Sequence, residues 1–412
     1  MPRSCRSLTP QQMLAVAGSM FQPTGDDLIG LECEWPVRDW QDPAARPDLE
    51  RLLRVAEEPL AGHGRITIEP GGQIELSSFP ARCLSDAIDT VNADADDINH
   101  RLLAVGLDSE EVALDHVRPP QRVLTHPRYV AMQAFFDAGG ASGRWMMCNT
   151  ASVQINVSNE TADPLRRWRT LNRIAPALLA AFANSRGVDA AGTSWASLRQ
   201  GIWGGIDPGR TKPVPLDRPP ALAWLEYALA ADVLYMLDED GNGSSGTSVA
   251  PGLSFWSWME HGHPAGYPTI EDFRYHLSTL FPPVRPRGWM ELRVLDALPR
   301  RMRTAAAVCV ATAVHADVSS EIDRLVPDVS HLHHEAARFG LGHPLLLESA
   351  RALMQVTTRH VEAATPRTEH ADALHEFADQ YTVRGLAPGD EGWCEIPLAL
   401  ATPEVRVATP TV

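Results

Sequence analysis

Glutamates recur at alternate positions in several short apolar segments of the chain. In a β-strand alternate residues point to the same face, so these glutamates would lie together, opposite the apolar residues. Carboxylates gathered on one face can bind divalent cations or exchange protons, which makes them the first candidates for chemistry. Five glutamates lie in such segments: Glu32, Glu34, Glu69, Glu75 and Glu291.

Other polar side chains follow the same alternation. Gln154 and Asn156 alternate with apolar residues in SVQINV, and Arg293 follows a glutamate by two positions in WMELRVLD. Together with LIGLECEW at residues 28–35 and ITIEPGGQIELS at residues 66–77, where Pro-Gly-Gly can turn the chain, these segments predict five strands.

The rest of the chain has mostly helical spacing. Apolar periodicity predicts helices over residues 84–105, 165–184 with a break at Pro176, and 222–237, and only helices after the strand at residues 289–296. One sheet with helices packed on its apolar side is an α+β fold.

Carboxylates on neighbouring strands, about 5 Å apart, repel one another unless they keep protons or bind cations. Oxygen-only ligands favour magnesium or manganese over zinc or copper. Magnesium usually completes its shell with waters and substrate phosphates, so the pattern predicts a metal-mediated site for ATP. In a single strand, alternating Glu and Gln is more typical of a solvated sheet face. Clustering on four strands favours the metal site.

Composition excludes several classes of function. The 412 residues carry 36 Lys plus Arg against 52 Asp plus Glu, a net charge of -16, which disfavours binding to nucleic acid or anionic membranes. We expect no signal peptide and no membrane span, because the apolar runs are too short or are interrupted by polar residues. Six cysteines without a CxxC pair favour neither a zinc ribbon nor a disulfide framework, so we expect a cytoplasmic protein.

The motifs that contain these residues resemble the glutamate–cysteine ligases, in particular the actinobacterial type that supplies γ-glutamylcysteine to ergothioneine biosynthesis. They occur in the order found in that family, and EPGGQ-x-ELS is the most specific of them. The motifs are GLECE at residues 30–34, EPGGQIELS at 69–77, TASVQINV at 150–157, RQGIWGGIDPGR at 199–210 and MELRVLD at 290–296.

The resemblance implies a role for each matching position. The five glutamates look like the metal-binding carboxylates, and Arg293 looks like the arginine that contacts the nucleotide and its transferred phosphoryl group. Catalysis is expected to depend most on Arg293, Glu75 and Glu291. The substrate-binding residues implied by the motifs are Thr150, Gln154, Asn156, Arg199, Trp203, Asp207 and Arg210.

The resemblance also implies a glutamine-synthetase-like fold, in which a curved antiparallel sheet holds ATP, glutamate and magnesium or manganese on its concave face. Helices would pack on the apolar face. We expect a catalytic region at residues 1–298 and a helical C-terminal part at residues 299–412, packed on the same domain.

The activity implied is ATP-dependent joining of the glutamate γ-carboxylate to the cysteine amine through γ-glutamyl phosphate. The partners are then the small molecules glutamate, cysteine and ATP. Three alternatives stay open: a ligase of the same superfamily with another amine acceptor, a phosphagen kinase, and a noncatalytic sensor that retains the nucleotide and metal site.

Four other features of the sequence also have simple structural explanations. DEDGNG at residues 238–243 resembles the start of a calcium loop but lacks its final glutamate, which favours an exposed turn. HLHHE at residues 331–335 could present metal ligands, although a solvated helix face is more typical. Residues 238–252, rich in Gly and Ser, could form a lid or an ordinary loop. Cys33 alternates to the apolar side, which predicts a core residue.

Overall fold

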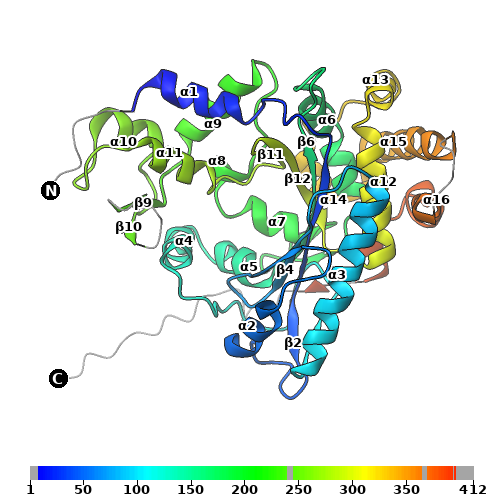
Figure 1. The fold of residues 1–412 in the computed structure, drawn as a ribbon, viewed down its shortest axis with the longest axis horizontal. Helices are drawn as coiled ribbons and strands as arrows, with labels where there is room; N and C mark the ends of the chain where they lie inside the picture. Colours follow the sequence, from blue (N-terminus) through cyan, green and yellow to red (C-terminus); the bar gives the residue numbers. More distant parts are fainter. Residues whose placement is uncertain (1–7, 239–244, 364–368, 393, 396–412) are drawn as a thin grey trace.

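A six-stranded antiparallel sheet forms the centre of the molecule (Figure 1). The computed structural model describes residues 8–238, 245–363, 369–392 and 394–395. The strands of the sheet lie in the order β11-β12-β6-β1-β4-β3. Their bounds are β1 (Ile29–Trp35), β3 (Arg65–Ile68), β4 (Ile74–Ser77), β6 (Ser152–Ser158), β11 (Val284–Pro286) and β12 (Trp289–Asp296).

All five predicted strands are present in this sheet. The sixth strand, β11, was missed because its three residues, VRP, are too few to show alternation and end in proline. Seven shorter strands form three small sheets elsewhere: β2 (Val37–Asp39), β5 (Leu107–Ser109), β7 (Gly187–Val188), β8 (Ser194–Trp195), β9 (Tyr235–Leu237), β10 (Gly246–Ser248) and β13 (Cys394–Glu395).

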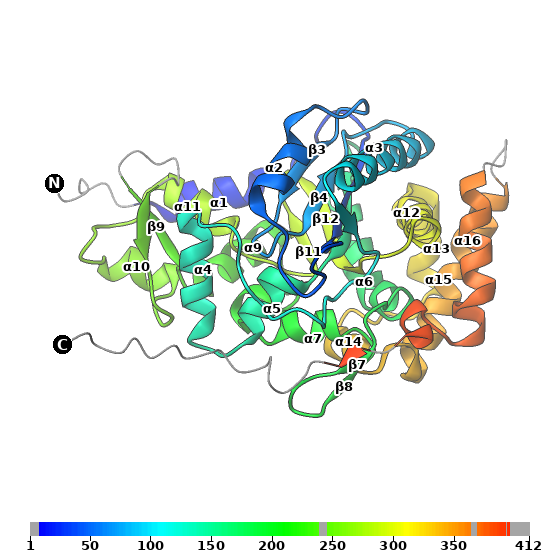
Figure 2. The same ribbon diagram turned by 90° about the horizontal axis from the view of Figure 1, so that it is seen from below.

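Helices pack on both faces of the sheet. On the apolar face, α3 (Leu84–Ala104), α6 (Arg166–Ala181) and α12 (Arg300–Ala313) contact the strands. Behind them lie α15 (Pro344–Ala363) and α16 (Glu369–Gln380) (Figure 2). The opposite, polar face is lined by α4 (Pro127–Asp137), α5 (Ser142–Asn149) and α7 (Leu198–Gly204), which lie across from α3 and α12 in Figure 1.

Shorter helices complete the structure. Among them α9 (Pro220–Ala230) packs against α1 and α10, and α10 lies at the side of the molecule away from α16 (Figure 1). The remaining helices are α1 (Pro10–Ser19), α2 (Leu49–Glu57), α8 (Pro208–Thr211), α9 (Pro220–Ala230), α10 (Phe255–His261), α11 (Ile270–Leu277), α13 (Ala316–Leu325), α14 (His333–Phe339), and the 3₁₀ turns η1 (Gly340–Gly342), η2 (Thr382–Arg384) and η3 (Pro388–Glu391).

Three helix predictions need correction. The chain after residue 296 is not entirely helical, because Cys394 and Glu395 form the strand β13 and pair with β7, and two residues are too few to show alternation. Pro176 does not break α6, which continues through it, because buried packing on the sheet and on α15 holds the helix together. The helix predicted over residues 222–237 ends at Ala230, and the buried residues Tyr235–Leu237 form the strand β9 instead. Periodicity alone does not separate a short buried strand from the end of a helix.

One hydrophobic core extends through both predicted parts of the chain. It joins Leu31 and Ile155 of the sheet to Val310, Leu353 and other residues beyond position 299. This continuity agrees with a C-terminal part packed on the catalytic region, while the division at residue 298 stays a prediction. No single helix among the described residues has the length and apolarity to cross a membrane. Only α12 and α13 pass that test together, and they are bent by 90° at the break between them.

Candidate active site

Four of the five predicted metal-binding glutamates line one cavity on the polar face of the sheet. The cavity has a volume of about 550 Å³, and we call it the acidic cavity after these residues: Glu32, Glu34, Glu69 and Glu75. Strand register explains why they meet. Glu34 of β1 lies directly opposite Glu75 of β4, which places two like charges side by side.

Burial and mutual repulsion make these carboxylates costly to ionise. Burial, followed by the charges of Glu291 and Glu75, raises the pKa of Glu32 to about 7. Burial and the charge of Glu75 raise the pKa of Glu69 well above its usual value. The pKa of Glu34 and that of Glu75 are also raised, in each case mainly by burial. A divalent cation would relieve this cost, because it offsets several negative charges at once.

The residues present fit magnesium better than a metal that needs a complete protein cage. Within the described ranges, no three His, Cys, Asp or Glu side chains converge as a ready-made metal centre. Magnesium does not require such a centre, because one or two carboxylates usually hold it together with waters and substrate phosphates. The donors in the acidic cavity are carboxylate, amide and hydroxyl oxygens, the hard ligands that magnesium prefers.

The Pro-Gly-Gly turn between β3 and β4 fixes two of the glutamates. A Cβ atom on Gly71 would lie 2.2 Å from the carbonyl oxygen of Cys148, so only glycine allows the turn to pack against the end of α5. Gln73 is buried, accepts from the Gly71 N–H at 3.0 Å and donates to the Thr150 carbonyl at 3.0 Å. Glu69 and Glu75 therefore flank a turn anchored to the cavity wall.

Glu291, the fifth predicted metal ligand, lies in a different environment. It is fully buried, and its carboxylate accepts from Arg285 at 2.5 and 3.0 Å, Arg287 at 3.2 Å and Arg293 at 3.1 Å. These ion pairs hold the pKa of Glu291 well below its usual value, although burial acts in the opposite direction. In the structure Glu291 aligns three arginines, which we call the arginine cluster, and its role as a metal ligand stays a prediction.

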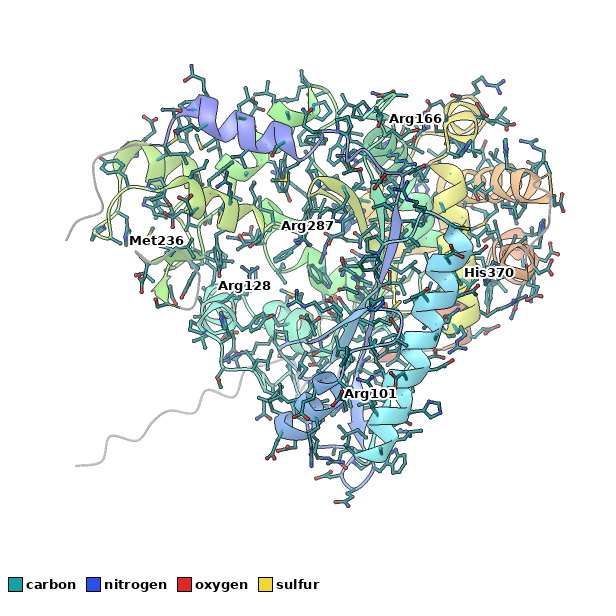
Figure 3. The ribbon with its side chains drawn as sticks, viewed as in Figure 1. Arg101, Arg128, Arg166, Met236, Arg287 and His370 are labelled. Atoms are coloured by element: carbon teal, nitrogen blue, oxygen red, sulfur yellow. The ribbon has the colours of Figure 1, made fainter. Side chains whose placement is uncertain are left out.

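The sequence reasoning missed two members of the arginine cluster. Arg285 belongs to the unpredicted strand β11, and Arg287 lies at the turn into β12. In VRPRGWMELR, Arg285 and Arg287 precede Gly288, and Glu291 and Arg293 follow it, each pair at alternate positions. Gly288 has a φ of 88° and allows the turn between the two pairs. The alternation was present, but Pro286 concealed it. Arg287 and Arg128 both line the acidic cavity, and Figure 3 labels them.

Gln154 and Asn156 separate the acidic and basic halves of the sheet face. The Gln154 amide donates to Glu34 at 3.2 Å and accepts from Arg293 at 2.5 Å. The Asn156 amide donates to Glu32 at 3.0 Å and accepts from the Trp289 indole at 3.1 Å. Each amide can pair with a carboxylate on one side and with an N–H donor on the other, because it carries both a donor and an acceptor. Their contact with substrate stays a prediction.

A β-bulge places Arg293 at the edge of the acidic cavity. Leu292 pairs with Ile155 and Leu295 pairs with Val153, so two residues of β12 lie opposite one residue of β6. Bulges of this kind redirect a side chain next to an active site. The Arg293 guanidinium lies 5.5 Å from the ring centre of Trp203 and 5.7 Å from that of Phe281.

A second cavity, of about 370 Å³, lies behind these two rings. Arg293, Trp203 and Phe281 line both cavities and form the wall between them. Arg199 lines the second cavity with a side chain only 2% exposed, and its Nε and Nη1 atoms have no hydrogen-bond partner among the residues that the structure describes. Its Nη1 atom lies 3.7 Å from Asp296. A buried guanidinium with free donors is suited to bind a carboxylate.

Three other predicted substrate residues lie in contrasting places. Thr150 lines the acidic cavity and donates to the Met146 carbonyl at 2.7 Å. Asp207 and Arg210 line neither of these two cavities, and their contact with substrate stays a prediction. Arg210 is fully buried and donates to Thr279 at 2.8 Å, while Asp207 caps α8. These two residues hold the segment after Trp203 in place.

The last predictions from the sequence concern Cys33 and the segments at residues 238–252 and 331–335. Cys33 is a buried core residue whose pKa burial raises to about 11, as predicted for the apolar face. In the part of the chain that the structure describes, no cluster of metal-binding side chains occurs at residues 331–335. The calcium-loop alternative at residues 238–243 lies outside the described residues apart from Asp238, and so does part of the lid predicted over residues 238–252.

The antiparallel sheet with helices packed on its apolar face is a glutamine-synthetase-like fold. The chain belongs to glutamate-cysteine ligase family 2, whose family model matches residues 28–391.

Several known proteins are similar to the chain. It is 33% identical over 380 residues to the glutamate–cysteine ligase EgtA of Mycobacterium tuberculosis, covering 88% of this chain and 84% of that protein. It is 32% identical over 378 residues to EgtA of Mycolicibacterium smegmatis, covering 87% and 88%. A glutamate–cysteine ligase of Francisella tularensis, solved in complex with AMP, shares the fold with a TM-score of 0.54 at 12% identity, covering 89% of this chain and 84% of that one.

Proposed function

We propose that the protein joins the γ-carboxylate of L-glutamate to the amine of L-cysteine with ATP, giving γ-glutamylcysteine, ADP and phosphate. The observation that carries the proposal is the acidic cavity, where four buried glutamates face the arginine cluster in a chain of glutamate-cysteine ligase family 2. The names of the mycobacterial relatives support the reaction. The same resemblance supports a place as the first step of ergothioneine biosynthesis, and the cysteine pattern supports a cytoplasmic location.

ATP is needed because a free carboxylate does not react with amines. A γ-carboxylate oxygen attacks the γ-phosphorus, the bond from phosphorus to the ADP oxygen breaks, and γ-glutamyl phosphate forms. The cysteine amine then attacks the acyl carbon, phosphate leaves, and the nitrogen loses a proton. Magnesium, or manganese, held by Glu32, Glu34, Glu69 and Glu75, would neutralise charge on the phosphates.

The arginine cluster has the position and charge to bind the transferred phosphoryl group. Arg293 lies at the wall between the two cavities, on the path that the phosphoryl group would take from ATP to glutamate. The negative charge on that group is greatest during transfer, and a guanidinium at this point would stabilise it. Glu291 holds the guanidinium in place before substrate binds, so little reorganisation is required. Arg285 and Arg287 add positive charge beside it.

The second cavity is proposed to bind the α-carboxylate of glutamate through Arg199. We expect Arg199→Met to raise the KM for glutamate about a hundredfold, with Arg199→Lys intermediate, because a charged hydrogen-bond pair would be lost. The KM for ATP should change less than threefold, since the acidic cavity is intact. Initial rates at saturating cofactor would measure both constants. An equal increase in both KM values would contradict this assignment.

The acceptor side chain is proposed to lie against three methionines of α4 and α5, which we call the methionine wall: Met132, Met146 and Met147. Their thioethers offer an apolar, polarizable surface that suits a thiol. A serine hydroxyl at the same place would lose its hydrogen bonds to water, and the thioethers would not replace them. We expect Met132→Gln to reduce the preference for cysteine over serine about tenfold.

Competition between cysteine and serine would measure this preference as a ratio of kcat/KM values. Met259→Gln is the matched control, because Met259 is similarly buried in α10 and lines neither cavity. The KM for glutamate should stay within about threefold of the wild-type value in both variants, because neither side chain lines the second cavity. Unchanged selectivity in a folded Met132→Gln protein would exclude the methionine wall as the acceptor pocket.

A direct test of the reaction is to incubate the purified protein with ATP, magnesium and glutamate, and to add each amino acid in turn. Mass spectrometry should detect γ-glutamylcysteine, with ADP release that depends on both amino acids. A product with a different amino acid would favour the ligase with another acceptor. ATP binding without any product would favour the noncatalytic sensor.

A further inference from the structure

Trp289 stands out among the residues on the polar face of β12. It is 36% exposed, whereas Glu291 and Arg293 on the same face of the strand are buried or nearly so. Its indole N–H donates to Asn156, and the Arg287 guanidinium lies 5.1 Å from its ring centre. These two contacts fix the orientation of a large aromatic ring at the edge of the acidic cavity.

Exposed side chains line the acidic cavity around Trp289. Trp289 lies beside Arg287, which is 44% exposed, and the exposed Arg65 also lines the cavity. Four residues further along β12, the largely buried Arg293 belongs to the wall that the cavity shares with the second one. A ligand with a flat aromatic head and an anionic tail would therefore place its head at Trp289 and its tail inward, along the arginine cluster.

We propose that Trp289 is the platform on which the adenine base of the nucleotide stacks. The inference rests on the proposed use of ATP and adds the residue that binds the base. Base-to-aromatic stacking stabilises bound nucleotides without requiring hydrogen bonds to the base edges. Exposure alone does not support the assignment, because Trp256 of α10 is 48% exposed but lines neither cavity.

Calorimetric titration of ADP and of inorganic tripolyphosphate, each with magnesium, would test the platform. We expect Trp289→Ala to weaken ADP binding about tenfold and to leave tripolyphosphate binding unchanged, because only ADP carries a base. Trp289→Phe should keep ADP affinity within about threefold of wild type, since phenylalanine can still stack. Trp256→Ala is the matched control and should bind both ligands as the wild type does.

Three results would overturn the platform. The first is wild-type ADP affinity in Trp289→Ala. The second is an equal loss of ADP and tripolyphosphate affinity, which would mean that Trp289 acts by positioning Arg287. The third is failure of the wild-type protein to bind ADP, which would refute the proposed function as well. If Trp289→Ala does not fold, a large loss of ADP affinity in folded Trp289→Phe would also count against stacking.

Discussion

The Glu75→Gln protein is expected to fold normally and to form γ-glutamylcysteine about a thousandfold more slowly than the wild type. The Oε1 atom of Glu75 accepts from the Thr67 hydroxyl at 2.8 Å and the Ser77 hydroxyl at 3.3 Å. A glutamine oxygen can accept both hydrogen bonds, so the strand pairing should survive. The charge that would hold magnesium against the phosphates is lost, and this loss should appear mainly in kcat.

Steady-state rates and thermal melting of the same preparation would check this result. Glu226→Gln is a suitable control, because Glu226 lies on the surface of α9 and pairs only with Arg218 among the ion pairs of the described residues. It should leave both activity and melting temperature unchanged. A fully active Glu75→Gln enzyme would remove Glu75 from the metal site. Glu291→Gln would be harder to interpret, because it also disturbs three ion pairs.

Arg293→Ala is expected to lower kcat about a thousandfold while changing the KM for ATP and glutamate much less. Its guanidinium lies between the two cavities, so it would contact the phosphoryl group most strongly while that group is in transfer. Arg293→Lys should recover part of the rate, because it restores the charge but not the paired donor geometry.

A purely structural role for Arg293 would give a different pattern. Gln154 and Glu291 would lose a partner in Arg293→Ala, which should lower the melting temperature somewhat. If Arg293 acted only by supporting the fold, kcat and thermal stability would fall together, and the lysine variant would restore both or neither. A loss of kcat in a folded protein, with ADP still bound, would identify Arg293 as a catalytic residue.

The sequence predicted the site well where alternation was regular. LECEW places a glutamate on every second residue and QIELS a polar residue, and one face of each strand is apolar and buried, so the side that each glutamate faces could be inferred. The strand order that sets Glu34 opposite Glu75 is a non-local property that spacing does not contain. The family resemblance, carried mainly by EPGGQIELS, implied an antiparallel sheet with these glutamates as metal ligands, but it gave no strand order.

Other parts of the site could not be predicted, for identifiable physical reasons. Arg285 and Arg287 are separated by a proline and do not form a recognisable strand pattern. The bulge at Arg293 depends on pairing with β6, 135 or more residues earlier in the chain. Arg210 donates to the carbonyl of Thr279, 69 residues later in the chain, and the motif around Arg210 does not contain that contact.

The central claim is that Glu32, Glu34, Glu69 and Glu75 hold divalent cations against the phosphates of ATP. The most direct measurement is a crystal structure with manganese, a non-hydrolysable ATP analogue and glutamate, using the anomalous signal of manganese to locate the ions. We expect anomalous peaks in the acidic cavity, each within bonding distance of these carboxylates and of phosphate oxygens. Nucleotide bound with no peak in that cavity, or with peaks only elsewhere on the surface, would contradict the claim.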